Sequence, residues 1–165
     1  MLIAYGLVLT AVGMDLRSMR ISNRLILIGQ AVSLVRRFLC EGISGFFTGI
    51  ILISLPVILL YLLFLVGALG AGDIKLFSLI GGFIQFKELM WCIMYSFLFA
   101  AIISLVKMLY IGTFFSSMKR VVSYICSILR GNLESYQPES IENGRIHFSI
   151  AILFGLIFTD IYLIS

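Results

Sequence analysis

Two of the three aspartates in this chain are the residues best suited to carry out chemistry. Asp15, Asp73 and Asp160 all lie in strongly apolar segments, where a carboxylate is costly and therefore indicates a function. Two carboxylates at the same depth can share a water molecule, with one carboxyl protonated and the other ionised, because adjacent like charges do not both ionise cheaply. The ionised member would take a proton from water while the protonated member polarises a scissile carbonyl. This is the chemistry of an aspartic protease.

The residues that precede Asp73 favour such a site. The sequence Gly-Ala-Gly-Asp occupies residues 70–73, and chance alone would give about 0.02 matches to Gly-x-Gly-Asp in a chain of this composition. Gly70 and Gly72 predict unusual backbone dihedrals and close approach of another chain, so an extended substrate could add there as a strand. Asp73 is also predicted near a helix N-terminus, where a carboxylate is favoured.

The composition indicates which elements must position these residues. Of 165 residues, 61% are hydrophobic and 12% are charged, against about 45–50% and about 25% in soluble domains. These values exclude a soluble single-core domain, and the 13% of aromatic residues excludes a disordered chain. We expect an all-α polytopic membrane protein in which residues 1–165 form one domain. The net charge of +4 indicates topology and anionic lipid rather than nucleic acid.

Six apolar segments are predicted to cross the membrane. The second is shorter than the roughly 20 residues that a span requires. The first carries no charge before its apolar run, so we interpret it as a retained helix with its N-terminus outside rather than as a cleaved signal. The six segments are residues 1–19, 21–35, 43–66, 67–86, 89–112 and 146–165.

Positive charge supports this topology. Three of the twelve lysines and arginines, Arg36, Arg37 and Lys87, are predicted outside, and the other nine in the cytoplasm. One crossing precedes Asp15 and three precede Asp73. Both carboxylates are therefore predicted at the cytoplasmic face, with the third aspartate near the outer end of the last segment.

The connection at residues 113–145 is predicted to lie on the cytoplasmic side. Apolar residues at helical spacing in its first half, opposite a basic face, predict an amphipathic helix on the inner leaflet. Residues 131–144 read as a polar loop.

Two smaller patterns concern packing and cysteine chemistry. Gly45 and Gly49 are four residues apart in the third segment, which predicts close helix packing. Cys40, Cys92 and Cys126 have neither paired nor metal-like spacing, so we expect no disulfide and no metal site.

Four short stretches together resemble the type IV prepilin peptidases. They are residues 15–17 (DLR), 20–23 (RISN), 70–76 (GAGDIKL) and 81–82 (GG). The chain as a whole is similar to the short members that serve Flp/Tad-type pili. It lacks the cytoplasmic insert with paired cysteines that larger members carry, so N-methyltransferase activity is not implied.

The resemblance implies a GxGD-type intramembrane aspartic endopeptidase without a cofactor. Such an enzyme would cut the leader peptide from prepilin-like precursors at the cytoplasmic face of the bacterial inner membrane. Six positions match motif residues of the family: the two catalytic aspartates, two conserved glycines, and an asparagine and a lysine that support the motifs or the substrate. These are Asp15, Asp73, Gly70, Gly72, Asn23 and Lys75.

The chain departs from the family pattern in two places. Ser22 stands where the family usually has proline, so the turn there is expected to be looser. Residues 146–150 (IHFSI) resemble a late motif that normally contains prolines, and this copy has none. The second departure concerns the last helix alone, and it does not affect the assignment of the aspartates.

Two alternative functions stay open at this point. One is another GxGD protease, preflagellin-cleaving or presenilin-like, although Met14 stands where presenilin-like enzymes have tyrosine and no Pro-Ala-Leu motif occurs. The other is a small transporter or assembly subunit that handles protons or cations through its membrane carboxylates. Placement of both aspartates at the membrane edge argues against transport, because transport sites lie near the midplane.

Overall fold

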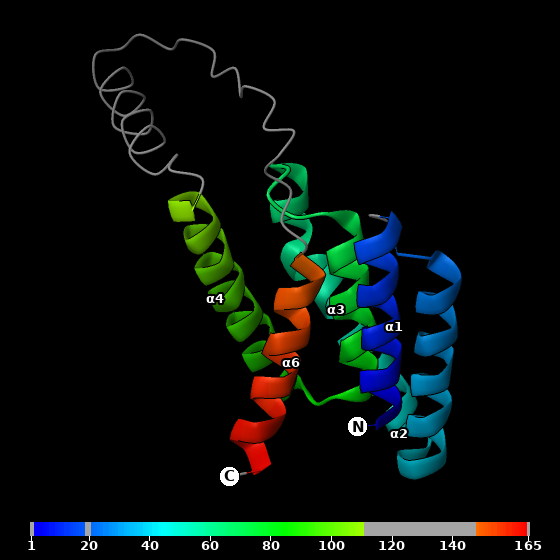
Figure 1. The fold of residues 1–165 in the computed structure, drawn as a ribbon. Helices are drawn as coiled ribbons and strands as arrows, with labels where there is room; N and C mark the ends of the chain where they lie inside the picture. Colours follow the sequence, from blue (N-terminus) through cyan, green and yellow to red (C-terminus); the bar gives the residue numbers. More distant parts are fainter. Residues whose placement is uncertain (1, 19–20, 111–147, 165) are drawn as a thin grey trace, which may run out of the picture. The chain divides into compact units, whose positions relative to one another are not determined.

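A computed structural model describes residues 2–18, 21–110 and 148–164. These residues form helices and short connections without any strand, which confirms the predicted all-α class. The helices are α1 (Leu2–Ser18), α2 (Asn23–Leu65), α3 (Ala71–Phe83), α4 (Phe86–Tyr110) and α6 (Phe148–Ile164) (Figure 1).

The chain divides into two compact units. The first comprises residues 1–99 and 147–165, and the second comprises residues 100–146. Only residues 100–110 of the second unit, the end of α4, are described. The predicted amphipathic helix and loop at residues 113–145 lie outside the described residues, as does Cys126. The single domain over residues 1–165 therefore stays a prediction.

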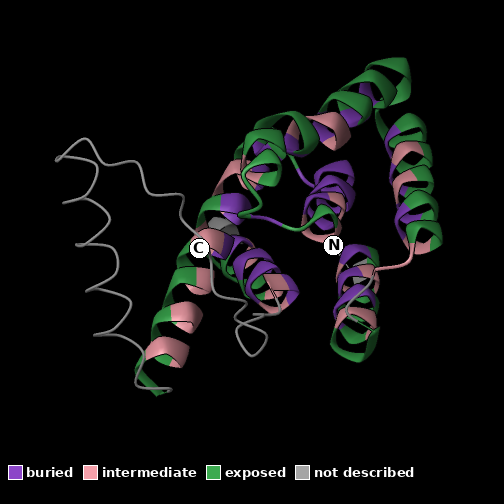
Figure 2. Cartoon of the chain, turned by 90° about the horizontal axis from the view of Figure 1, so that it is seen from above, coloured by how far each residue is buried: buried purple, intermediate pink, exposed green. Residues whose placement is uncertain are grey.

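Two of the described helices, α2 and α4, are long and apolar enough to cross a membrane, and α6 is apolar but shorter. Large apolar side chains are exposed along both long helices. Figure 2 colours the exposed residues of these helices green. Extensive exposed apolar surface is typical of contact with lipid or protein rather than with water. The number of six crossings stays a prediction.

A sharp bend at Gly42 divides α2 into two limbs, residues 23–41 and residues 43–65. The backbone of Gly42 has φ 68° and ψ −150°, a conformation that favours glycine. The chain folds back at this point, because a Cβ added at Gly49 would contact Leu34 and Arg37 of the first limb. Close packing at Gly49 was predicted and is confirmed. The expected end of the second segment at residue 35 is wrong, since the helix continues to residue 41.

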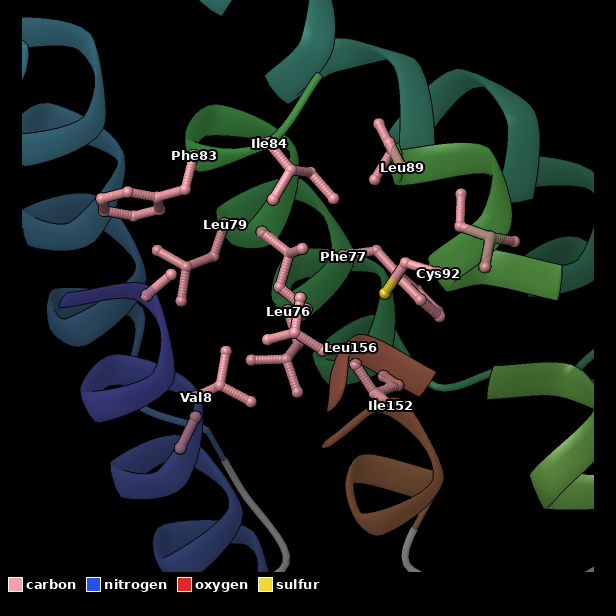
Figure 3. Close-up of a cluster of buried hydrophobic side chains, with 14 of the residues drawn as sticks. Val8, Leu76, Phe77, Leu79, Phe83, Ile84, Leu89, Cys92, Ile152 and Leu156 are labelled. Carbon is pink, nitrogen blue, oxygen red and sulfur yellow. The ribbon is translucent and has the colours of Figure 1, made fainter. Parts of the chain in front are cut away.

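The short helix α3 forms the centre of the first unit. Nine of its 13 residues are buried, so it is surrounded by other helices on most sides. Figure 3 shows its apolar side chains against those of α1, α4 and α6, including Val8, Leu89, Cys92, Ile152 and Leu156.

Small residues allow α3 to approach both limbs of α2 closely. A Cβ at Gly81 would overlap the carbonyl oxygen of Leu52, and one at Gly82 would overlap the Ser33 side chain. Ser78 adds polar contacts inside this interface: its Oγ donates to the Ile53 carbonyl at 2.6 Å and accepts from Gln30 at 2.9 Å. The glycine pair at residues 81–82 therefore has a packing role.

Arg37 has a structural role that its charge count did not predict. We expected it on the outer side of the membrane as a topology charge, which stays a prediction; the structure shows that its side chain is buried, with 6% of its surface exposed. Its Nε and Nη2 donate to the carbonyls of Gly82 at 2.8 Å and Ile84 at 2.6 Å. Carbonyls at a helix C-terminus lack helical partners, so the guanidinium stabilises the end of α3. Glu41 lies 3.7 Å from the same guanidinium.

Candidate active site

Asp73 lies in the first turn of α3, which confirms its predicted place at a helix N-terminus. It is the third residue of the helix, and its carboxyl accepts a hydrogen bond from the backbone N–H of Gly70, the N-cap residue. This contact resembles the reciprocal half of a capping box. The positive end of the helix dipole favours a carboxylate at this position.

The two glycines of the motif do not adopt the unusual dihedrals that we expected. Gly70 has φ −78° and ψ 149°, which any residue can adopt, and Gly72 lies within the helix. Gly70 is distinguished by a close neighbour, because a Cβ there would lie 3.0 Å from Asp73 Oδ2. A Cβ at Gly72 would lie 3.6 Å from Ile21, an ordinary contact.

The positive φ in this region occurs upstream, at Gly67 (φ 75°). Its N–H donates to the carbonyl of Phe64 at 3.0 Å, and the N–H of Ala68 donates to Leu63 at 2.9 Å. These two bonds are those of a Schellman motif, which ends α2 and sends the chain into residues 68–70. Gly67 thereby sets the position from which α3 and Asp73 start.

Asp15 lies near the end of α1 and approaches Asp73. Both side chains are half-buried, and the charge of Asp15 acts on the Asp73 carboxyl. The structure thus brings together the two aspartates that the crossing count placed on one face.

A serine of α6 joins this pair. The hydroxyl of Ser149 donates to Asp15 Oδ2 at 2.6 Å, and the Ser149 side chain is fully buried. The sequence interpretation missed this contact. The only signal was that Ser149 lies in residues 146–150, which were considered for their missing prolines alone.

Two further motif residues contact each other beside the pair. Lys75 Nζ donates to Asn23 Oδ1 at 2.8 Å, which links the first residue of α2 to the first turns of α3. The predicted site residues therefore lie near the end of α1 and the starts of α2 and α3, and these three helix ends lie at the same end of the first unit (Figure 1).

Asp160 lies away from this junction, as predicted. It accepts a hydrogen bond from the Tyr5 hydroxyl at 2.8 Å. Asp160 is eleven residues beyond Ser149 on α6, about 16 Å along a helix. The contacts Asp15–Ser149 and Tyr5–Asp160 show that α1 and α6 run in opposite directions side by side.

The arrangement suits acid–base chemistry. Two half-buried carboxyls that interact can hold a water molecule and divide one proton between them. Among the described residues, no group of three His, Cys, Asp or Glu side chains could hold a metal ion.

Comparison with known proteins gives one match. The model of a family described as the type IV leader peptidase family matches residues 2–105. The matched range includes Asp15, Asn23 and Asp73 and stops before Ser149. Neither a curated protein nor a solved structure matches the chain.

Proposed function

The chain belongs to the type IV leader peptidase family, and from this membership we propose that it is an intramembrane aspartic endopeptidase with Asp15 and Asp73 as its catalytic pair. The observation that carries the proposal is the approach of these two half-buried side chains from separate helices, close enough for the charge of Asp15 to act on the Asp73 carboxyl. No other pair of aspartates in the described residues meets in this way.

The proposed reaction uses one water molecule and returns both carboxyls to their starting state. One carboxylate takes a proton from water while the water oxygen adds to the scissile carbonyl carbon, and the other carboxyl gives its proton to the carbonyl oxygen. The tetrahedral intermediate then breaks its C–N bond: the departing amine takes the proton that the first carboxylate received from water, and a hydroxyl of the intermediate returns its proton to the second carboxylate. The hydrogen bond from the Gly70 N–H at the start of α3 holds the Asp73 carboxyl in place during these steps.

The substrate that we propose is a prepilin-like precursor of the Flp/Tad type. Its apolar helix would stay in the bilayer while its polar leader reaches the carboxyls from the cytoplasm. Six crossings of the bacterial inner membrane, an outer N-terminus and contact with lipid complete the proposal. The apolar exposed surface of α2 and α4 and the bias of positive charge support this placement.

The two alternative functions, a transporter or assembly subunit and another GxGD protease, are not equally supported. Family membership makes the protein a peptidase, so a transporter or assembly subunit has no observation in its favour. Preflagellin-cleaving and presenilin-like proteases would act on other substrates than the proposed prepilin-like precursor. Incubation with a prepilin-like precursor and with an ordinary signal-peptide remnant separates them: cleavage of the remnant alone would contradict the proposed substrate.

The catalytic assignment is tested by replacing each aspartate with asparagine, which keeps the size and removes the charge. We expect Asp15→Asn and Asp73→Asn to reduce precursor cleavage at least about thousandfold, because both roles need a titratable carboxyl. Asp160→Asn is the matched control, since it still accepts the Tyr5 hydrogen bond, and it should retain cleavage. Wild-type cleavage in either of the first two variants would refute the assignment.

A further inference from the structure

We propose that Ser149 is a positioning residue of the aspartate pair, whose hydroxyl holds the Asp15 carboxylate in the orientation that serves catalysis. This inference rests on the proposed function and adds to it a contribution from α6, which lies outside the part of the chain that the family model matches.

The hydrogen bond of Ser149 differs from those of most other hydroxyls in these helices. Serine and threonine side chains in apolar helices usually donate to a carbonyl one turn earlier in the same helix, as Ser96 does to Cys92 and Thr159 does to Gly155. Ser149 instead donates to a carboxylate 134 residues away at 2.6 Å. In any state of the pair in which Asp15 is the ionised member, this hydrogen bond is stronger than one to a carbonyl.

The start of α6, which carries Ser149, is held in place by packing. The ring of Phe148 packs against Phe77 of α3 and Phe97 of α4, with centroid distances of 6.2 and 5.5 Å. Ser149 itself is fully buried, which leaves its hydroxyl little freedom to choose another partner. The first residues of α6 are thereby fixed against the helix that carries Asp73.

The consequence concerns orientation more than stability. A carboxylate on a helix end can rotate about its side-chain bonds, and a donor on a separate, packed helix restricts that rotation. Misplacing a reacting group by about 1 Å can reduce a rate about hundredfold. Ser149 should therefore affect the rate of the chemical step and leave substrate binding unchanged.

The test compares Ser149→Thr with Ser149→Val in the full-length protein in detergent, with a prepilin-like precursor as substrate. The two replacements have nearly the same shape, so any cost of added bulk is common to both, and only threonine keeps the hydroxyl. We expect kcat of the valine variant to be about ten- to hundredfold below that of the threonine variant, with KM equal within about twofold. Equal kcat values in the two variants would overturn the inference.

Two additional variants keep the result interpretable. Ser149→Ala adds no bulk, and its kcat should fall below that of the wild type by about the factor that separates the valine variant from the threonine variant, even if both larger side chains disturb packing. Thr159→Val removes a buried hydroxyl from the same helix far from Asp15 and should leave kcat unchanged. An equal loss in Thr159→Val would mean that any hydroxyl of α6 acts through folding, which would also overturn the inference.

Failure of this inference is distinguishable from failure of the proposed function. If Ser149→Ala cleaves normally while Asp15→Asn is inactive, the aspartate pair stands and the positioning role falls. If Asp15→Asn cleaves normally, the proposed function falls, and with it the reason for a positioned Asp15.

Discussion

At Gly70, little space separates the backbone from the Asp73 carboxylate. A Cβ would lie 3.0 Å from Oδ2, so the carboxylate would have to shift by a few tenths of an ångström. Gly72 has no such neighbour, because the nearest atom to its added Cβ is a methyl carbon of Ile21 at 3.6 Å. The two glycines of the motif are therefore not equivalent.

This difference predicts that Gly70→Ala is more harmful to catalysis than Gly72→Ala. We expect the first to lower kcat about tenfold, because it displaces a reacting carboxylate, and the second to stay within about threefold of the wild type. Steady-state cleavage of a precursor measures both. If Gly72→Ala proved the more harmful variant, the contact with substrate rather than the contact with Asp73 would explain the motif.

Among single residues, the aspartates could be found from the sequence, whereas Ser149 could not. A carboxylate in an apolar segment is conspicuous because its desolvation is costly. A serine there is common, since it can satisfy its hydroxyl within its own helix. Only the hydrogen bond to Asp15 in the folded structure shows that this serine faces another helix.

Among the elements, α3 depends most on its neighbours. It is short and almost entirely buried, and it is held at its start by the Gly67 turn and at its end by Arg37. The sequence placed Arg36 and Arg37 together on the outer side of the membrane, because an arginine pair usually closes a membrane segment. The structure distinguishes them: Arg37 is buried and Arg36 is exposed.

This distinction predicts unequal effects when each arginine is replaced by methionine. Arg37→Met leaves the carbonyls of Gly82 and Ile84 without their donor and should reduce the free energy of unfolding by about 2–5 kcal/mol. Arg36→Met should change it by less than about 0.5 kcal/mol, as exposed substitutions usually do. Unfolding in detergent with a denaturant series measures both values. Equal losses would show that the charge, and not the two hydrogen bonds, stabilises this end.

For the molecule as a whole, the proposed topology requires both carboxyls to face one compartment. The ends of α1 and α3 that carry them belong to the same unit and lie together, whereas Arg37 meets the opposite end of α3. A 13-residue helix separates these two ends by about 20 Å.

Single cysteines therefore predict a labelling pattern across the membrane. In a variant without native cysteines, Ser18→Cys and Ala71→Cys should react with a membrane-impermeant maleimide from the cytoplasmic side only. Lys87→Cys, beside the other end of α3, should react from outside only. All three replaced residues are exposed. Labelling of positions 18 and 71 from opposite sides would remove the basis for a shared active site.

The sequence by itself determined the helical class and the apolar segments and singled out Asp15 and Asp73, because these follow from local hydropathy and from the cost of a charge in an apolar segment. It also indicated that Asn23 and Lys75 belong to the same motif set. Tertiary structure alone decided that α2 turns at Gly42 and that Arg37 stabilises the end of α3. It alone decided that Ser149 meets Asp15. These features join residues far apart in the chain. Which of those residues meet is decided by how the helices pack, and a local sequence pattern carries no information about that packing.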